Sequence, residues 1–281
     1  MADDKKEKKK DWAIHVAEAH ILGRLAKAPK EKKDKKIGLA LVIPTFQKGG
    51  GKQWIPCPID IVGDDRARAM EASVGDYIEL TARFASRSFT DDNEDNKSLL
   101  VLQHDPYRSF NVRPADASED PFNPPMDDVC FTRVLLAGRH FINKKQRDEG
   151  KDTPILREGN GKYCYVKLTY QDPFQTVPEG EWPKDIFFDF SINGDLAERV
   201  SKWCRYRAQL MVRGELGMGK ADWTRDGKSP MEPRIFVMPG GFNFMNLDRQ
   251  SSGEQKKPTE TETYDENDSE GVPGLDDDLP F

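Results

Sequence analysis

Ile21-Leu22-Gly23-Arg24-Leu25 and Leu135-Leu136-Ala137-Gly138-Arg139 lie near the start of two stretches that follow one plan. In each, an apolar run reaches Gly-Arg and then gives way to a polar, lysine-rich segment. A short apolar run bounded by such a segment predicts a buried β-strand. The repetition predicts two copies of one structural unit, here called block one (residues 11–112) and block two (residues 128–247).

Each block later contains a run in which apolar and polar residues alternate. The apolar members are Ile78, Leu80, Ala82 and Phe84 in block one, and Ala208, Leu210 and Val212 in block two. Because successive side chains of a strand point to opposite faces, each run predicts a strand with one face in the core.

One helix-like segment precedes each alternating run. Residues 64–73 form the first, and residues 194–204 form the second, with Trp203 on its apolar face and therefore expected in the core. Strands, one helix and further strands, in a block of about 100 to 120 residues, are typical of the five-stranded OB barrel. The sequence thus predicts an all-β protein with two tandem OB-fold barrels, each with one helix.

Three further segments are poor in apolar residues. Residues 1–10 form a charged lead, and residues 248–281 form an acidic tail; both compositions predict disorder. Residues 113–127 contain four prolines among small and acidic residues, which predicts a linker between the blocks.

The net charge of the chain divides unevenly. The 281 residues include 43 Lys and Arg and 49 Asp and Glu, a formal charge of −6. From Asp248 onward, eleven acidic residues stand against Arg249, Lys256 and Lys257, so the tail carries −8. The other 247 residues therefore hold 40 basic and 38 acidic residues, a net of +2. A slightly basic body with an acidic tail is typical of a polyanion-binding module.

Several classes of function find no support in the sequence. No apolar run approaches the roughly 20 residues of a membrane helix, and none follows the lysine-rich start, so we expect a cytoplasmic protein without membrane contact. The four cysteines show no metal-ligand spacing, which predicts four small buried residues and no metal or other cofactor. The absence of nucleophile and metalloprotease motifs predicts that the chain is not an enzyme.

A glycine-rich basic segment in block one fits a ligand-binding hairpin. Gly49, Gly50 and Gly51 lie between Lys48 and Lys52, which predicts a basic hairpin between two strands. Trp54 follows, in a setting where an indole can stand on a barrel surface. Exposed rings that stack on bases, beside cations that contact phosphates, are what binding of a single-stranded nucleic acid requires.

The chain ends in three carboxylates and an apolar tip: Asp276, Asp277, Asp278, Leu279, Pro280 and Phe281. A tail that does not fold has no structural use for a terminal phenylalanine. This combination predicts a partner-binding tip, in which Phe281 fills a basic-rimmed pocket on another protein.

The tip closely resembles that of bacterial single-stranded DNA-binding proteins, which end in Asp-Asp-Asp-Ile/Leu-Pro-Phe. Block two adds to the resemblance. Gly194-Asp195-Leu196-Ala197-Glu198 is similar to the family's Gly-Lys-Leu-Ala-Glu at the start of its helix. Arg213-Gly214-Glu215-Leu216, followed by Trp223-Thr224-Arg225-Asp226-Gly227, is similar to its Glu-Gly-x-Leu and Trp-x-Asp-x-x-Gly.

The resemblance implies a set of base-stacking rings and phosphate contacts. The rings are Phe46, Trp54 and Phe89 in block one, and Phe174, Phe187 and Trp223 in block two; an inserted Pro-Glu-Gly-Glu leaves Phe187 and Trp182 as alternatives for one position. The cations flanking them are Lys48, Lys52, Arg83, Arg87, Arg139, Lys144, Lys145, Lys162, Lys167, Arg213, Lys220 and Arg225.

The resemblance implies sequence-independent binding of single-stranded DNA in replication, recombination and repair. It implies recruitment of replication and repair proteins through the tip. Family members with two barrels per chain, as in the Deinococcus–Thermus group, form homodimers with four barrels, and we expect the same here. The alternatives are an OB-fold protein-interaction hub and a strand-annealing accessory factor, both with weak affinity for nucleic acid.

Overall fold

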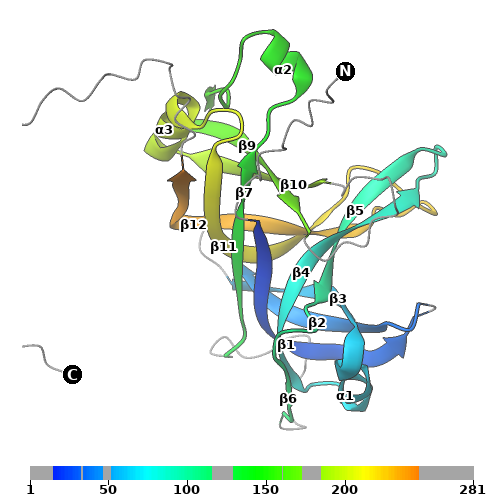
Figure 1. Cartoon of the computed structure of the whole chain (residues 1–281). Coiled ribbons are helices and arrows are strands. Elements are labelled where there is room, and N and C mark those ends of the chain that lie inside the picture. Colours follow the sequence, from blue (N-terminus) through cyan, green and yellow to red (C-terminus); the bar gives the residue numbers. More distant parts are fainter. Residues whose placement is uncertain are drawn as a thin grey trace, which may run out of the picture. The chain divides into compact units, whose positions relative to one another are not determined.

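The structure is a computed structural model that describes residues 15–32, 34–46, 52–115, 129–159, 161–172 and 185–246 (Figure 1). By its contacts the chain divides into two units, Met1–Asp248 and Arg249–Phe281. All described residues belong to the first unit. The predicted charged lead, most of the predicted linker and the acidic tail lie outside the described residues.

The described residues of block one form six strands and two short helical segments. In chain order these are β1 (Val16–Glu31), β2 (Ile37–Phe46), β3 (Lys52–Ile61), η1 (Gly63–Asp65), α1 (Arg66–Glu71), β4 (Tyr77–Thr90), β5 (Asn96–His104) and β6 (Phe110–Arg113). The helix expected over 64–73 is present as η1 followed by α1. β2 and β3, on either side of the predicted basic hairpin, pair antiparallel, and residues 47–51 between them lie outside the described residues.

Five strands of block one pair in a closed circuit. β1 pairs with β2, β2 with β3, β3 with β5, β5 with β4, and β4 returns to β1. The β3–β5 pairing is parallel and joins Ile59 to Leu102, and the other four are antiparallel. α1 lies between β3 and β4 in the chain.

Block two has a similar order of long strands. The elements of its described residues are β7 (Phe131–His140), α2 (Lys144–Asp148), β8 (Arg157–Gly159), β9 (Gly161–Gln171), β10 (Asp185–Asn193), α3 (Asp195–Trp203), β11 (Gln209–Lys220) and β12 (Met231–Asn246). Because α2 and β8 follow its first strand, the prediction of one helix in each block was wrong for block two. β7 pairs with β9 and β11, β9 with β10, and β11 with β12. Between β10 and β12 the contact is through side chains, with the rings of Phe190 and Phe242 6.2 Å apart.

The two Gly-Arg motifs occupy equivalent places in the blocks. Gly23 lies where β1 approaches β2, and a Cβ there would be 2.9 Å from the carbonyl oxygen of Val42. Gly138 lies where β7 approaches β9, and a Cβ there would be 2.2 Å from the carbonyl oxygen of Thr169. Since only glycine permits such close backbone approach, the repeated motif has one structural cause in both blocks.

The first strands of the two blocks also pair with each other. β1 and β7 run antiparallel from Val16 opposite Ala137 to Leu22 opposite Phe131. When Gly138 is aligned with Gly23, Val134 corresponds to Ala19, and these two residues face each other in the ladder. The blocks are therefore related by a local two-fold axis through this pair. Their cores are continuous, because Phe84 of β4 packs edge-on against Phe188 of β10 at 5.1 Å.

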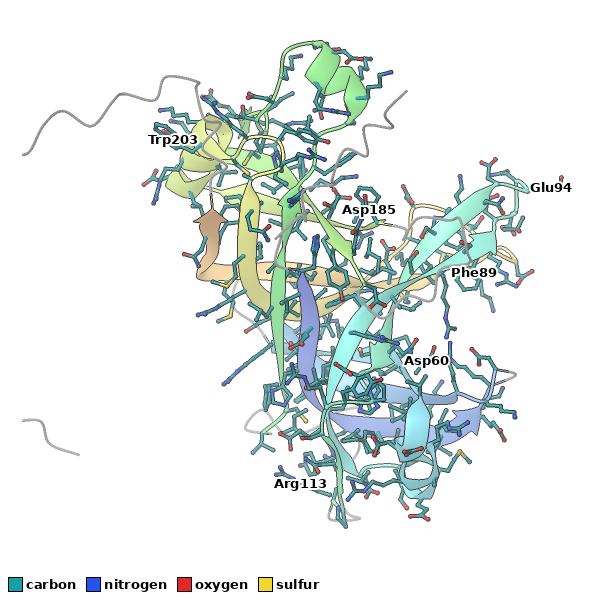
Figure 2. All side chains as sticks on the ribbon, viewed as in Figure 1. Asp60, Phe89, Glu94, Arg113, Asp185 and Trp203 are labelled. Atoms are coloured by element: carbon teal, nitrogen blue, oxygen red, sulfur yellow. The ribbon has the colours of Figure 1, made fainter. Side chains whose placement is uncertain are left out.

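The sequence-based expectations for the core are confirmed with one exception. Every apolar member of the two alternating runs is buried, as are the four cysteines, Cys57, Cys130, Cys164 and Cys204. The prediction for Trp203 was wrong: its side chain is 61% exposed. Trp203 is the last residue of α3, so no further turn covers its ring, which Figure 2 shows at the outside of the molecule. None of the described helices has the length and apolar character needed to cross a membrane.

Candidate nucleic-acid interface

One group of half-buried rings lies where two hairpins from different blocks meet. Phe89 lies on β4 in the β4–β5 hairpin, and Trp223 lies in the connection from β11 to β12. Their ring centroids are 6.3 Å apart with an angle of 34° between the planes, and the Arg225 guanidinium lies 5.3 Å from the Phe89 ring centroid. Figure 2 shows Phe89 on the hairpin that carries Glu94 at its tip. Two rings expected to act separately thus form one cluster.

Asp92 joins these two hairpins. Its carboxylate accepts hydrogen bonds from the Thr224 hydroxyl at 2.7 Å, the Asp226 N–H at 2.7 Å and the Gly227 N–H at 3.2 Å. Its own N–H donates to the Thr224 carbonyl at 3.1 Å. These hydrogen bonds hold the pKa of Asp92 below its usual range, and the bond from the Thr224 hydroxyl has the largest effect. The carboxylate is therefore ionised at neutral pH.

The local sequence explains why the β11–β12 connection can receive a carboxylate. Arg225 and Lys228 pair through both backbone hydrogen bonds, and Asp226 and Gly227 between them have φ of 52° and 68°. Two consecutive positive φ angles match a type I′ hairpin turn, for which Asp-Gly is a favoured pair. The N–H groups of this turn point to the same side and meet the Asp92 carboxylate.

A second group of rings lies on the outer face of β9 and β10. Strict alternation buries Ile186, Phe188 and Phe190 and leaves Phe187 42% exposed on the other face. Tyr165 of β9 is 57% exposed on the same side of the sheet. The alternation thus identifies Phe187 as an exposed ring, and Trp182, its alternative, lies outside the described residues.

Cations and another ring surround this outer face. The Lys167 ammonium lies 5.6 Å from the Phe187 centroid, and the Arg157 guanidinium lies 5.3 Å from the Tyr165 centroid. Phe141 packs edge-on against Phe187 at 5.1 Å. A pocket of about 180 Å³ lined by Phe141, Tyr165 and Lys167 adjoins the two rings. The sequence left the orientation of Tyr165 open, because strand alternation allowed either face, and it gave no signal for Phe141.

Trp54 of block one is half-buried on the outer face of β3. Cys57, Ile59 and Ile61 fill the core face of this strand, and Trp54 lies opposite Pro44 of β2. Phe46 and Lys52 face each other at the ends of β2 and β3, and their side chains lie outside the described part of the chain. The predicted contacts at Lys48, Phe174 and the tip, Asp276 to Phe281, also lie outside the described residues.

Two of the predicted phosphate contacts in block one are engaged in ion pairs. Arg87 pairs with Asp60, a buried carboxylate that also pairs with Lys32. Arg83 lies 3.8 Å from Asp172 of block two. A buried carboxylate destabilises the fold when it loses a partner, so Arg87 is held at Asp60.

The predicted cations of block two are more accessible. Lys162 pairs with Glu198, and Lys167 lies 3.3 Å from Asp189, but these pairs are at the surface, where a phosphate competes easily. Arg139 is partly buried on β7. Among the described residues, no carboxylate forms an ion pair with Lys144, Lys145, Arg213 or Lys220, all of which are exposed.

A separate pocket of about 700 Å³ lies on the sheet that the blocks share. Its lining includes His20 of β1, Phe131 and Leu135 of β7, and Met238 of β12. Phe236, 50% exposed, lies beside it over Gly217. No group of three metal-ligating side chains occurs in the part of the chain that the structure describes.

Comparisons with known proteins point to one fold. No protein-family model matches the chain, and no curated protein matches its sequence. The structure is similar to that of the single-stranded DNA binding protein from Thermus aquaticus, with a TM-score of 0.51 and 15% identity over 89% of this chain and 98% of that chain. A deletion mutant of the same protein matches at a TM-score of 0.52 and 15% identity over 85% of this chain and 98% of that chain. The chain therefore has the fold of this protein.

Proposed function

We propose that each block is an OB barrel and that the chain binds single-stranded DNA without regard to sequence. The observation that carries this proposal is that rings on both blocks are at least partly exposed and that three of them, Phe89, Tyr165 and Phe187, have a cation over the ring. Trp54 and Trp223 are the other two partly exposed rings. The closed pairing circuit of block one and the matching strand order of block two support the barrel assignment. The fold shared with the single-stranded DNA binding protein from Thermus aquaticus supports single-stranded DNA as the ligand.

The mechanism combines stacking with counterion release. Each stacked base contributes about 1–3 kcal/mol and is accepted whatever its identity, because every base has a π-face. Lys144, Lys145, Lys167 and Lys220 contact the backbone, and each phosphate they neutralise makes the slope of log K against log salt concentration more negative by about 0.7. Binding is therefore tight at low salt and selective for unpaired strands, whose bases are free to stack.

The wider role proposed here is protection of single strands in replication, recombination and repair, with partner proteins recruited through Phe281. We place a homodimer contact on the sheet that the blocks share. Its pocket has apolar lining residues such as Phe131 and Leu135, and Phe236 and Met238 are exposed beside or within it. Burial of such residues against a second copy is favourable.

Titration with poly-dT tests the proposal. Tryptophan fluorescence should be quenched to a defined site size at low salt, recover at high salt, and stay unchanged with duplex DNA. Trp54→Ala and Trp223→Ala should together remove most of the quenching, whereas Trp203→Ala, a matched change of a tryptophan exposed on α3, should leave the affinity unchanged. Equal binding to duplex, or no binding, would instead favour the protein-interaction hub.

A further inference from the structure

The β4–β5 hairpin extends beyond the core of block one and needs support from elsewhere. From Ser86 to Thr90 none of its residues is buried, whereas alternate residues from Ile78 to Phe84 are fully buried. An isolated two-stranded hairpin is marginally stable in water. The contact with the β11–β12 connection is therefore important for fixing this hairpin in place.

The contact is built around one residue. Asp92 makes four hydrogen bonds to residues 224, 226 and 227, more than a hundred positions away in the chain. Three of them go to an ionised carboxylate, and hydrogen bonds to a charged acceptor are about twice as strong as neutral ones. Asp95, in the same turn, instead pairs with its neighbour Lys97 at 3.0 Å.

The bonds fix the two aromatic rings relative to each other. Phe89 is three residues before Asp92, and Trp223 is adjacent to Thr224, so both rings lie close to the hydrogen bonds that join the two hairpins. A base stacked between two rings requires the rings to be roughly 7 Å apart, which is twice a carbon–carbon contact distance. The ring centroids of Phe89 and Trp223 are 6.3 Å apart, which is near this value. Arg225 adds a positive charge beside them. Groups held in a binding geometry bind more tightly because less conformational entropy is lost.

We propose that these two hairpins form one composite site for unpaired bases of a strand that passes from block one to block two, with Asp92 as its positioning residue. The site rests on the proposed function, since its ligand is single-stranded nucleic acid. Asp92 acts through Phe89 and Trp223 and does not itself contact the strand. Both blocks must supply residues for the site to exist.

The sign of one mutational effect separates this proposal from simple electrostatics. Asp92 is a negative charge beside a polyanion, so its charge alone weakens binding and its removal would tighten it. If Asp92 positions the rings, removal has the opposite result. Asp92→Ala should weaken binding of fluorescein-labelled oligo-dT about five- to tenfold at fixed low salt, the equivalent of roughly one hydrogen-bonded contact.

The matched control is Asp95→Ala, which removes the same charge from the same turn without touching block two. It should leave affinity unchanged or tighten it slightly. Thr224→Val, which keeps the shape and charge of the turn, should weaken binding in the direction of Asp92→Ala. In a double-mutant cycle, Asp92→Ala should add little to Phe89→Ala, because both changes disable the same site. The unfolding midpoint of each variant, measured by circular dichroism, shows whether the variant is folded under the conditions of the binding assay.

Each outcome has a definite meaning. Unchanged affinity in Asp92→Ala, or fully additive effects with Phe89→Ala, would overturn the composite site while leaving the proposed function intact. Tighter binding would also overturn it, and would mean that Asp92 competes with phosphate for the N–H groups of Asp226 and Gly227. If the unaltered chain fails to bind oligo-dT at all, the proposed function fails and the composite site fails with it.

Discussion

Block one and block two share a strand order but present different surfaces. In block one the β3–β5 pairing completes the circuit of strands, and Arg83 and Arg87 are held by Asp172 and Asp60. In block two the outer face of β9 and β10 carries exposed rings, with cations at the surface beside them. Repetition of a fold thus does not repeat the side chains on its surface, and block two has the larger set of exposed rings beside cations.

The largest difference between the blocks is expected at the two equivalent glycines. Gly138→Ala should destabilise the protein by about 3 kcal/mol or more, because its Cβ would lie 2.2 Å from a backbone carbonyl. Gly23→Ala, at 2.9 Å, should lose about 1–2 kcal/mol. Chemical denaturation of both variants measures the difference. Equal losses would contradict the tighter approach in block two.

Removal of exposed rings compares the two binding faces. Tyr165→Ala with Phe187→Ala should weaken oligo-dT binding about 30-fold or more, since two stacking contacts are lost. Trp54→Ala in block one should weaken it about tenfold, through a single half-buried ring. Fluorescence anisotropy of a labelled oligo-dT measures both. A larger loss for Trp54→Ala would reverse the ranking of the blocks.

A buried histidine in each block responds to pH. Burial lowers the pKa of His140 to about 4, so the folded protein resists the protonation that the unfolded chain undergoes near pH 6.5. Its contribution to stability is complete above pH 6.5 and is lost as the pH falls toward 4, by about 2 kcal/mol between pH 7 and pH 5. Burial also lowers the pKa of His104, but there the Asp65 carboxylate favours the charged form.

The expected result is that His140→Gln flattens the dependence of unfolding free energy on pH more than His104→Gln does. Denaturation at a series of pH values measures this. A pH profile unchanged by His140→Gln would show that another group titrates in this range.

Substitution of cations is expected to have the smallest effects. It separates a cation that stabilises the fold from cations that contact phosphate. Arg87→Gln should lower stability by about 1–2 kcal/mol, because Lys32 is then the one ion-pair partner of Asp60 left among the described residues. Lys144→Gln with Lys145→Gln should leave stability unchanged and make the salt slope of DNA binding less steep by about 1.4, which is about 0.7 for each of two lost phosphate contacts. Should Arg87→Gln reduce the salt slope without loss of stability, Arg87 would be a phosphate contact after all.

Sequence patterns predicted the framework because it depends on local periodicity. The alternation from Ile78 to Phe84 and the repeated Gly-Arg motif identified strands whose burial follows from side-chain direction. Trp203 was misplaced because helical periodicity identifies a face but not the residue at which the covering strands end. The sequence left Phe187 and Trp182 as alternatives for one stacking position. The strict alternation of buried and exposed residues along β10 identifies Phe187 as an exposed ring.

The composite site left no local signal. Asp92 and Thr224 are ordinary turn residues, and only the packing of the two blocks brings them together. Likewise Arg87, an apparently free arginine in the sequence, meets the buried carboxylate of Asp60 from another strand. Such contacts depend on tertiary structure, which residue spacing does not encode.

Photo-crosslinking would show directly whether a single strand contacts the rings of both blocks. Oligo-dT containing 5-iodouracil would be irradiated with the full chain at low salt, and the attached residues identified by mass spectrometry. We expect cross-links to rings of both blocks, including Tyr165 on β9, Phe187 on β10, and Phe89 or Trp223 at the paired hairpins. Cross-links confined to one block, or to residues away from these rings, would contradict it.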